Sequence, residues 1–243
     1  MKQLTEAHLF HCHGWRNGRR CNNGWWPRGA LRMCRDVGVA DEACYPYDSR
    51  HKGCQGLGED WEERVVQIGG YHRLTSTRAM KQQLAESGPL IACYTVYEDF
   101  YAYSSGIYRH VSGKREGGHC VCCVGYDDDG QYWICKNSWG AGFGESGYFR
   151  IAYGECGIDG DMWALDEVQE AGWRRRRTID GVYGSHAERN AWVHVEGLGW
   201  RALADGNSAA FRVLLVAALA AKSRAALVDL RLVRGKIAEL YVL

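Results

Sequence analysis

The period of the apolar and polar pattern changes from one stretch of the chain to the next, and each period predicts a helix or a strand. Apolar residues recur at helical spacing behind Pro27 and stop at Gly38, which predicts a helix over Pro27–Val37. A strand at Arg64–Ile68 and a helix over about Thr77–Glu86 follow. The next stretch has the pattern of strands, which we expect at Leu90–Tyr94, Gly106–Arg109, His119–Tyr126, Tyr132–Lys136, Gly147–Tyr153 and Met162–Ala164. A helical, loop-rich first part and an antiparallel second part favour an α+β fold with two lobes.

The last stretch of the chain has a pattern of its own. Trp192–Val195 and Gly199–Leu203 are typical of a hairpin. Ser208–Ala221 is typical of a helix, and Leu227–Val233 with Ile237–Leu243 of a second hairpin. We therefore expect a small, separate α/β module here.

Composition changes at the same place. Residues 1–170 carry 18 Lys/Arg against 23 Asp/Glu, a net charge of −5, whereas residues 171–243 carry 12 against 6, a net charge of +6. All 11 cysteines fall between Cys12 and Cys156. These breaks predict a domain over residues 1–170, a basic linker over 171–177 and a module over 178–243. The Arg174–Arg177 run favours a solvated linker, with a processing site or an anion-binding patch as the alternative.

The overall composition limits partners and location. The net charge of +1 provides no field to attract nucleic acid or an anionic membrane, and the apolar run Val213–Ala221 is too short to cross a bilayer. Eleven cysteines point to an extracytosolic, secreted or lysosome-like compartment. Because no apolar signal segment follows Met1, we expect the true N-terminus to lie upstream. The oligomeric state stays open.

The candidate catalytic residues occur in two segments, Gly118-His119 and Lys136–Gly140, and the second reads Lys-Asn-Ser-Trp-Gly. The two segments are separated by the spacing expected of successive strands. An Asn side-chain carbonyl can accept an imidazole N–H and fix its tautomer, which leaves the other ring nitrogen for a thiol. A Trp beside this bond can exclude water. A lone histidine is more often structural, but the Asn-Ser-Trp partner favours a base of the thiol-protease type.

From Leu4 to about Ala164 the sequence resembles the papain-like cysteine peptidases. The ordered matches are Leu4–His8 with Cys12, Cys21–Gly24, Tyr45–Tyr47, Gly88-Pro89, Tyr103–Tyr108, His119 with Val124–Tyr126, Tyr132–Gly140, Gly144–Ile151 and Cys156–Ile158. The resemblance implies a two-lobed papain-like fold, here a partial helical lobe plus an antiparallel β-barrel lobe. It also implies hydrolysis of peptide or protein substrates without a cofactor or metal.

The resemblance assigns roles residue by residue. His119 would be the general base and acid, Asn137 its orienting partner and Trp139 the shield over their bond. The substrate cleft would be lined by Asn23, Gly24, Trp26, Gly118 and Phe143. Cys12 would pair with Cys54, and Cys34 with Cys44. The alternative of a metal site at His11-Cys12-His13 is less favoured than a half-cystine.

The sequence departs from the family at the nucleophile. The family's Cys-Gly-Ser-Cys-Trp segment and its oxyanion glutamine are absent, and counting back from His119 by the expected spacing of roughly 130–150 residues passes Met1. Cys21 is thereby left without its usual mate. We therefore expect an endopeptidase chain that is truncated at its front and inactive alone. The alternative is a non-catalytic pseudopeptidase that binds extended peptides.

Two further alternatives remain. The four cysteines Cys120, Cys122, Cys123 and Cys135 favour buried thiols in the barrel wall over a soft-metal site, because alternation along a strand separates them. The C-terminal module could itself be the main binding unit, with Tyr183, Trp192 and Trp200 stacking on a ligand, although core packing is the commoner role of such residues.

Overall fold

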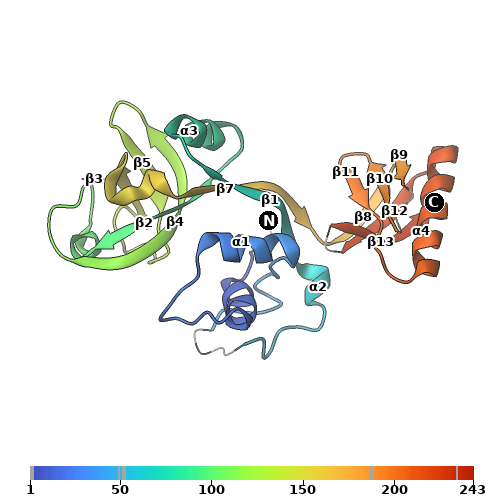
Figure 1. Cartoon of the computed structure of the whole chain (residues 1–243), viewed down its shortest axis with the longest axis horizontal. Coiled ribbons are helices and arrows are strands. Elements are labelled where there is room, and N and C mark those ends of the chain that lie inside the picture. The colour runs from blue at the N-terminus through green and yellow to red at the C-terminus, as the bar shows by residue number, and fades with distance from the viewer. Residues whose placement is uncertain (1–2, 49, 51–52, 186–188, 234) are drawn as a thin grey trace. The chain divides into compact units, whose positions relative to one another are not determined.

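The structure is a computed structural model that describes residues 3–48, 50, 53–185, 189–233 and 235–243 (Figure 1). The chain divides into two units, residues 70–166, and residues 1–69 together with 167–243. Strand β1 (Val66–Leu74) begins in one unit and continues into the other. The α+β class expected from the sequence is confirmed, since the described residues contain both helices and antiparallel sheets.

Residues 70–166 supply most of a seven-stranded sheet in the order β1-β7-β2-β4-β5-β6-β3. Its other strands are β2 Leu90–Tyr97, β3 Ile107–Tyr108, β4 Arg115–Asp127, β5 Tyr132–Lys136, β6 Tyr148–Ala152 and β7 Met162–Glu170. The helix α3 (Thr77–Glu86) packs against β2 and β4, and short 3-10 turns occur at Glu98–Ala102 and Glu155–Gly160. Alternate residues of β4, β5 and β6 enter one buried core, of which Trp133 and Phe149 are fully enclosed.

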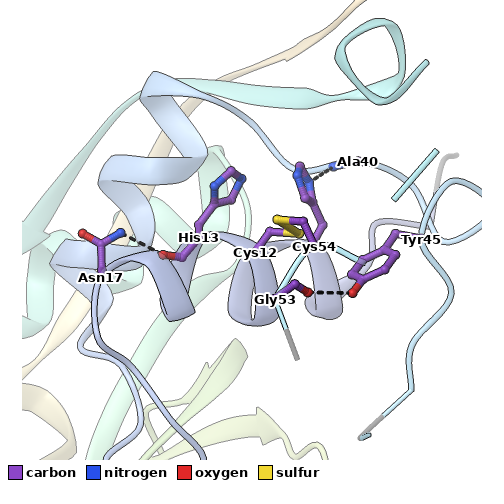
Figure 2. The surroundings of a disulfide bond; sticks show 8 residues. Cys12, His13, Asn17, Ala40, Tyr45, Gly53 and Cys54 are labelled. Atoms are coloured by element: carbon purple, nitrogen blue, oxygen red, sulfur yellow. Dashed lines mark hydrogen bonds between the residues drawn. A yellow bond between two sulfur atoms is a disulfide. The ribbon is translucent and has the colours of Figure 1, made fainter. Parts of the chain in front are cut away.

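The N-terminal part is helical, with a π-helical turn at His8–Gly14, then α1 (Pro27–Asp36) and α2 (Trp61–Arg64). Figure 2 shows the Cys12–Cys54 disulfide that ties the π-helical turn to a later loop. Beside it, Tyr45 donates its hydroxyl hydrogen to the Gly53 carbonyl at 2.9 Å. This disulfide is the pairing implied by the family resemblance.

A buried histidine lies in the same π-helical turn as Cys12. The Nδ1 atom of His8 accepts a hydrogen bond from the backbone N–H of Ala40 at 2.9 Å, and the side chain is 1% exposed. Its ring centroid lies 4.5 Å from that of His13. Burial, followed by the nearby His13 and Arg16, lowers the pKa of His8 from 6.5 to about 4. His8 is therefore an uncharged structural acceptor at neutral pH.

The C-terminal part consists of two small sheets and a helix, and its buried cluster runs from Ile179 to Ile237. The sheets have the orders β11-β10-β9 and β13-β12-β8, and the helix α4 packs against β9 and β13. The elements are β8 Gly172–Arg177, β9 Ile179–Gly184, β10 Ala191–Val195, β11 Gly199–Ala202, α4 Ser208–Arg224, β12 Val228–Val233 and β13 Lys236–Val242. No helix within the described ranges is long and apolar enough to cross a membrane.

Several expected elements need correction. Residues 171–177 are not a solvated linker, because Gly172–Arg177 forms strand β8 and pairs with β12. Asp229 accepts from the Arg175 side chain at 2.5 Å and from the Arg176 backbone N–H at 2.9 Å, which neutralises part of the basic run. Strand β9 was missed entirely. The boundary near residue 170 stays a prediction.

The cysteines also differ from expectation. Cys93 and Cys120 form a disulfide between directly opposed positions of β2 and β4, so Cys120 is not a buried thiol. Cys122 on the same strand is an exposed thiol, whereas Cys123 and Cys135 are buried and face each other across β4 and β5. The implied Cys34–Cys44 pairing is wrong, since both are free thiols. Among the described residues no group of three or more His, Cys, Asp or Glu side chains could hold a metal ion.

The Cys93–Cys120 disulfide should contribute strongly to stability. It joins residues 27 positions apart. In the chain-entropy account, losing a cross-link over such a loop costs about 3 kcal/mol. We expect the Cys93→Ala/Cys120→Ala double variant to lose about that much free energy of unfolding in urea titrations. Cys122→Ala, a matched change on the same strand, should cost less than about 0.5 kcal/mol. Equal effects of the two changes would contradict this assignment.

The buried His8 predicts acid sensitivity. In the unfolded chain a histidine binds its proton near pH 6.5, whereas folded His8 resists protonation until about pH 4. Stability should be complete above pH 6.5, fall by about 3 kcal/mol as the pH drops to about 4, and then level off. His8→Asn keeps an acceptor oxygen and does not titrate, so its melting temperature should fall less over that range while matching the wild type at pH 8. Parallel melting curves of the two proteins across pH would refute the prediction.

Candidate active site

The pairing of β4 with β5 brings the two polar residues together. Cys122 lies opposite Lys136, the last residue of β5. Continuing this register places Asn137 opposite Val121, on the same face of the sheet as His119. On its other side His119 is paired with Tyr94 of β2, whose ring centroid is 5.9 Å from the imidazole centroid. His119 is the fifth residue of β4 rather than its first, because β4 begins at Arg115.

A hydrogen bond joins the two side chains. The distance from His119 Nε2 to Asn137 Oδ1 is 2.8 Å, and the backbone N–H of Ser138 donates to the same oxygen at 2.9 Å. A backbone N–H can only donate, so the shared atom must be the amide oxygen. His119 Nε2 must then carry a hydrogen in the neutral ring. The imidazole is thereby held as the Nε2–H tautomer, with Nδ1 as its remaining acceptor.

Aromatic rings cover this bond. The indole of Trp139 stacks on the His119 ring with centroids 5.1 Å apart and planes inclined by 26°. Tyr101 stacks on Trp139 at 5.4 Å. Asn137 is 7% exposed and Trp139 is 38% exposed. The bond is therefore largely removed from water while the ring above it remains at the surface.

Phe143 and Gly118 complete the group within residues 70–166. Phe143 is half-buried and meets Trp139 edge-on, with centroids 5.0 Å apart, so it supports the indole. Gly118 pairs with Thr95, and a Cβ placed on it would meet nothing within 4 Å. The surface directly before His119 is consequently open.

The other three expected cleft residues lie together in the turn before α1. Asn23 accepts from the backbone N–H of Arg20 at 2.7 Å, and Gly24 has a φ of 57°, a left-handed value that favours glycine. Trp26 is the residue before α1 and is 67% exposed. Trp25 packs against Gly29, where a Cβ would lie 2.5 Å from the indole nitrogen. The turn thus presents one indole outward and holds the other inward.

Five of the described free thiols are poor candidates for a nucleophile. Burial raises the pKa of Cys34 to about 11 and that of Cys156 to about 12. Partial desolvation of the sulfur also raises the pKa values of Cys44 and Cys122, the latter although the residue as a whole is exposed, and a hydrogen bond to Cys123 together with burial raises that of Cys135. A raised pKa keeps a thiol protonated and weakly nucleophilic near neutral pH.

Two features of this site were not expected from the sequence. Tyr101, in the 3-10 turn Glu98–Ala102, stacks on the shielding indole, and no local signal separates it from neighbouring aromatics. The Cys93–Cys120 disulfide lies one residue from His119 along β4. Only the strand register could have revealed it, because Cys93 precedes Tyr94 just as Cys120 follows His119.

Comparison with known proteins identifies related sequences and structures. Residues 1–165 match the family described as papain family cysteine protease. Cathepsin B-like CP3 of Giardia intestinalis is 40% identical over 156 residues, covering 59% of this chain and 52% of that protein. Cathepsin B of Dictyostelium discoideum is 44% identical over 183 residues, covering 67% of this chain and 58% of that protein.

Solved structures agree. A procathepsin B from Trypanosoma congolense is 29% identical with a TM-score of 0.60, covering 68% of this chain and 61% of that chain. The chain spans about half the length of the curated relatives it matches. In three of them the matched part covers 52%, 52% and 47% of the relative's own length. The family match over most of the chain, together with the papain-like fold, shows that this chain belongs to the papain family of cysteine proteases.

Proposed function

We propose that residues 1–170 form the histidine-bearing part of a cysteine-type endopeptidase site, and that the nucleophilic thiolate comes from a segment outside these 243 residues. The observation that carries the proposal is the 2.8 Å contact between His119 Nε2 and Asn137 Oδ1 beneath Trp139. The cathepsin B-like relatives support a peptide or protein substrate. On this proposal the chain alone does not cleave peptides.

The tautomer of His119 determines the steps available to it. With Nε2–H bonded to Asn137, Nδ1 is the atom that would take the proton from the thiol. The thiolate would attack the peptide carbonyl carbon, and Nδ1–H would protonate the leaving amine nitrogen, which yields a thioester. Nδ1 would then take a proton from water as it attacks the thioester, which releases the carboxylic acid and the thiolate, and Nδ1–H would return its proton to that sulfur.

The remaining cleft and location assignments are part of the proposal. By the family resemblance, Asn23, Gly24, Trp26 and Gly118 would be substrate-contacting residues, with Phe143 acting through Trp139. The disulfides Cys12–Cys54 and Cys93–Cys120 favour an oxidising, extracytosolic location. No cofactor takes part.

A chimera tests the missing thiolate. The segment that precedes the matched region in Cathepsin B-like CP3 would be joined to the front of this chain. We expect no thiol-inhibitor-sensitive hydrolysis of a fluorogenic peptide by the chain alone and clear hydrolysis by the chimera. In the chimera, His119→Ala should lower kcat/KM at least about 1,000-fold. His72→Ala, a change to an exposed histidine of β1, should not.

Two outcomes would count against the proposal. Inhibitor-sensitive hydrolysis by the chain alone would mean that its nucleophile is among the present cysteines. A folded chimera that binds peptide without cleaving it would favour the non-catalytic pseudopeptidase instead.

The orienting role of Asn137 has a direct spectroscopic test. Asn137→Ala removes the oxygen that holds His119 as the Nε2–H tautomer, so the neutral ring should become a mixture of both tautomers. Long-range ¹H–¹⁵N spectra at pH 8.5, assigned with His119→Gln, measure this. Ser138→Ala keeps the backbone N–H and should leave the tautomer unchanged. An unaltered His119 signal in Asn137→Ala would show that the amide does not orient the ring.

A further inference from the structure

The indole of Trp139, which covers the candidate site, lies in the loop after β5 and is only partly held by the core. It is 38% exposed, and it follows Lys136, the last residue of β5, in that loop. Phe100 and Phe143 meet it edge-on, with ring planes inclined by 64° and 83°. An edge-on ring touches the indole along one side, so it blocks sliding more than it blocks tilting. A parallel neighbour is needed to hold the indole flat.

Tyr101 supplies such a parallel contact. Its ring stacks on the indole of Trp139 with planes inclined by 16° and centroids 5.4 Å apart, which is an offset-stacked geometry. A tilted indole would press one of its edges into the phenol ring. Tyr101 is itself 57% exposed, so burial in the core does not explain its place. It also lies outside the segments that carry the family resemblance, of which Tyr103–Tyr108 is the nearest in sequence.

The 3-10 turn that carries Tyr101 is anchored to the loop before β4. The Glu98 backbone N–H donates to the Lys114 carbonyl at 3.1 Å, and the Lys114 backbone N–H donates to the Glu98 carboxylate at 3.2 Å. A Cβ on Gly113 would lie 2.7 Å from Glu98 Cβ, and the φ of 97° also favours glycine there. Phe100, the residue before Tyr101, is fully buried. The turn therefore has little freedom to carry Tyr101 away from the indole.

The carboxylate of Asp99 adds a second set of anchors to the same turn. It accepts hydrogen bonds from the Tyr108 hydroxyl at 2.6 Å and from the backbone N–H groups of Val111 and Ser112 at 2.8 and 3.2 Å. His110 Nδ1 lies 3.1 Å from both carboxylate oxygens. Desolvation raises the pKa of Asp99, but these hydrogen bonds outweigh it and lower the pKa overall. The group is therefore an ionised acceptor at neutral pH.

We propose that Tyr101 is a positioning residue of the candidate site, which acts through Trp139 to keep water from the His119–Asn137 hydrogen bond. Water weakens such a bond because it offers both groups other partners. A stacked ring on the indole makes the exposing tilt rarer, and the anchored turn keeps that ring in place. The inference rests on the proposed function, since the bond serves catalysis only if His119 is the base.

The rate at which the His119 Nε2–H hydrogen exchanges with water tests this role on the chain as it stands, without hydrolysis. It is measured by ¹H–¹⁵N spectroscopy, with the signal assigned by His119→Gln. Tyr101→Ala should raise the rate about ten-fold or more, because the indole would uncover the bond more often. Tyr101→Phe keeps the ring, so its rate should stay within about two-fold of the wild type. Asp99→Asn replaces one acceptor oxygen by a donor and should raise the rate by a smaller factor, about three-fold.

The matched control is Tyr71→Ala. Tyr71 lies on β1 of the same sheet, and its ring is 6.0 Å from that of Trp163 rather than Trp139. This change should leave the exchange rate as it is in the wild type. Circular dichroism verifies that each variant is folded. An unchanged rate in Tyr101→Ala, an equal rise in Tyr71→Ala, or a full rise in Tyr101→Phe would overturn the proposal.

The chimera with the Cathepsin B-like CP3 segment separates positioning from substrate contact. There Tyr101→Ala should lower kcat about ten-fold and change KM by less than about two-fold. A change in KM alone would mean that Tyr101 binds the substrate directly, which contradicts a positioning role. A chimera that hydrolyses no peptide counts against the proposed function, whereas the exchange rates still decide the role of Tyr101.

Discussion

The candidate site is organised around one atom, the side-chain oxygen of Asn137, which receives N–H groups from both His119 and Ser138. The Ser138 donor is a backbone N–H, whose position is fixed by the chain. If the Asn137 amide rotated so that its oxygen and nitrogen exchanged places, its NH₂ group would face this N–H, and two donors would oppose each other. Burial makes that exchange costly, because a polar group that loses its partner away from water costs about 1–3 kcal/mol. The imidazole orientation and tautomer follow from this constraint. The same constraint depends on the sheet, whose register brings the end of β5 beside the middle of β4.

Around that atom the barrel supplies a rigid support. Phe100, Phe143 and Phe149 interlock beneath Trp139, and Tyr94 buttresses His119 from the neighbouring strand. The Cys93–Cys120 disulfide adds a covalent link one residue from His119. A papain-type site needs such support, because an orienting hydrogen bond is useful only when both partners are held within a few tenths of an ångström.

The sequence predicted those features that depend on local pattern or on a dense motif. Thr77–Glu86 and Tyr132–Lys136 have the expected bounds, because Gly and Asp-Gly turns delimit them. The approach of Asn137 to His119 was expected from the motif. The Cys93–Cys120 disulfide was not, because cross-strand pairing depends on register, which alternation alone does not specify.

The segment Gly172–Arg177 was expected to be a solvated linker, and this was wrong because its charge is compensated by Asp229, which lies far away in sequence. Similarly, Trp192 and Trp200 are apolar enough for a core but are 41% and 48% exposed, and only the position of α4 shows which face of their sheet is covered.

The central claim is that these 243 residues carry the base of a papain-type site without its thiolate. Intact-mass measurement after incubating the purified chain with an epoxysuccinyl thiol-protease inhibitor at neutral pH tests it most directly, since that reagent marks an activated catalytic cysteine covalently. The account predicts an unchanged mass at stoichiometric inhibitor. A single adduct on a cysteine of this chain, abolished by His119→Ala, would contradict it.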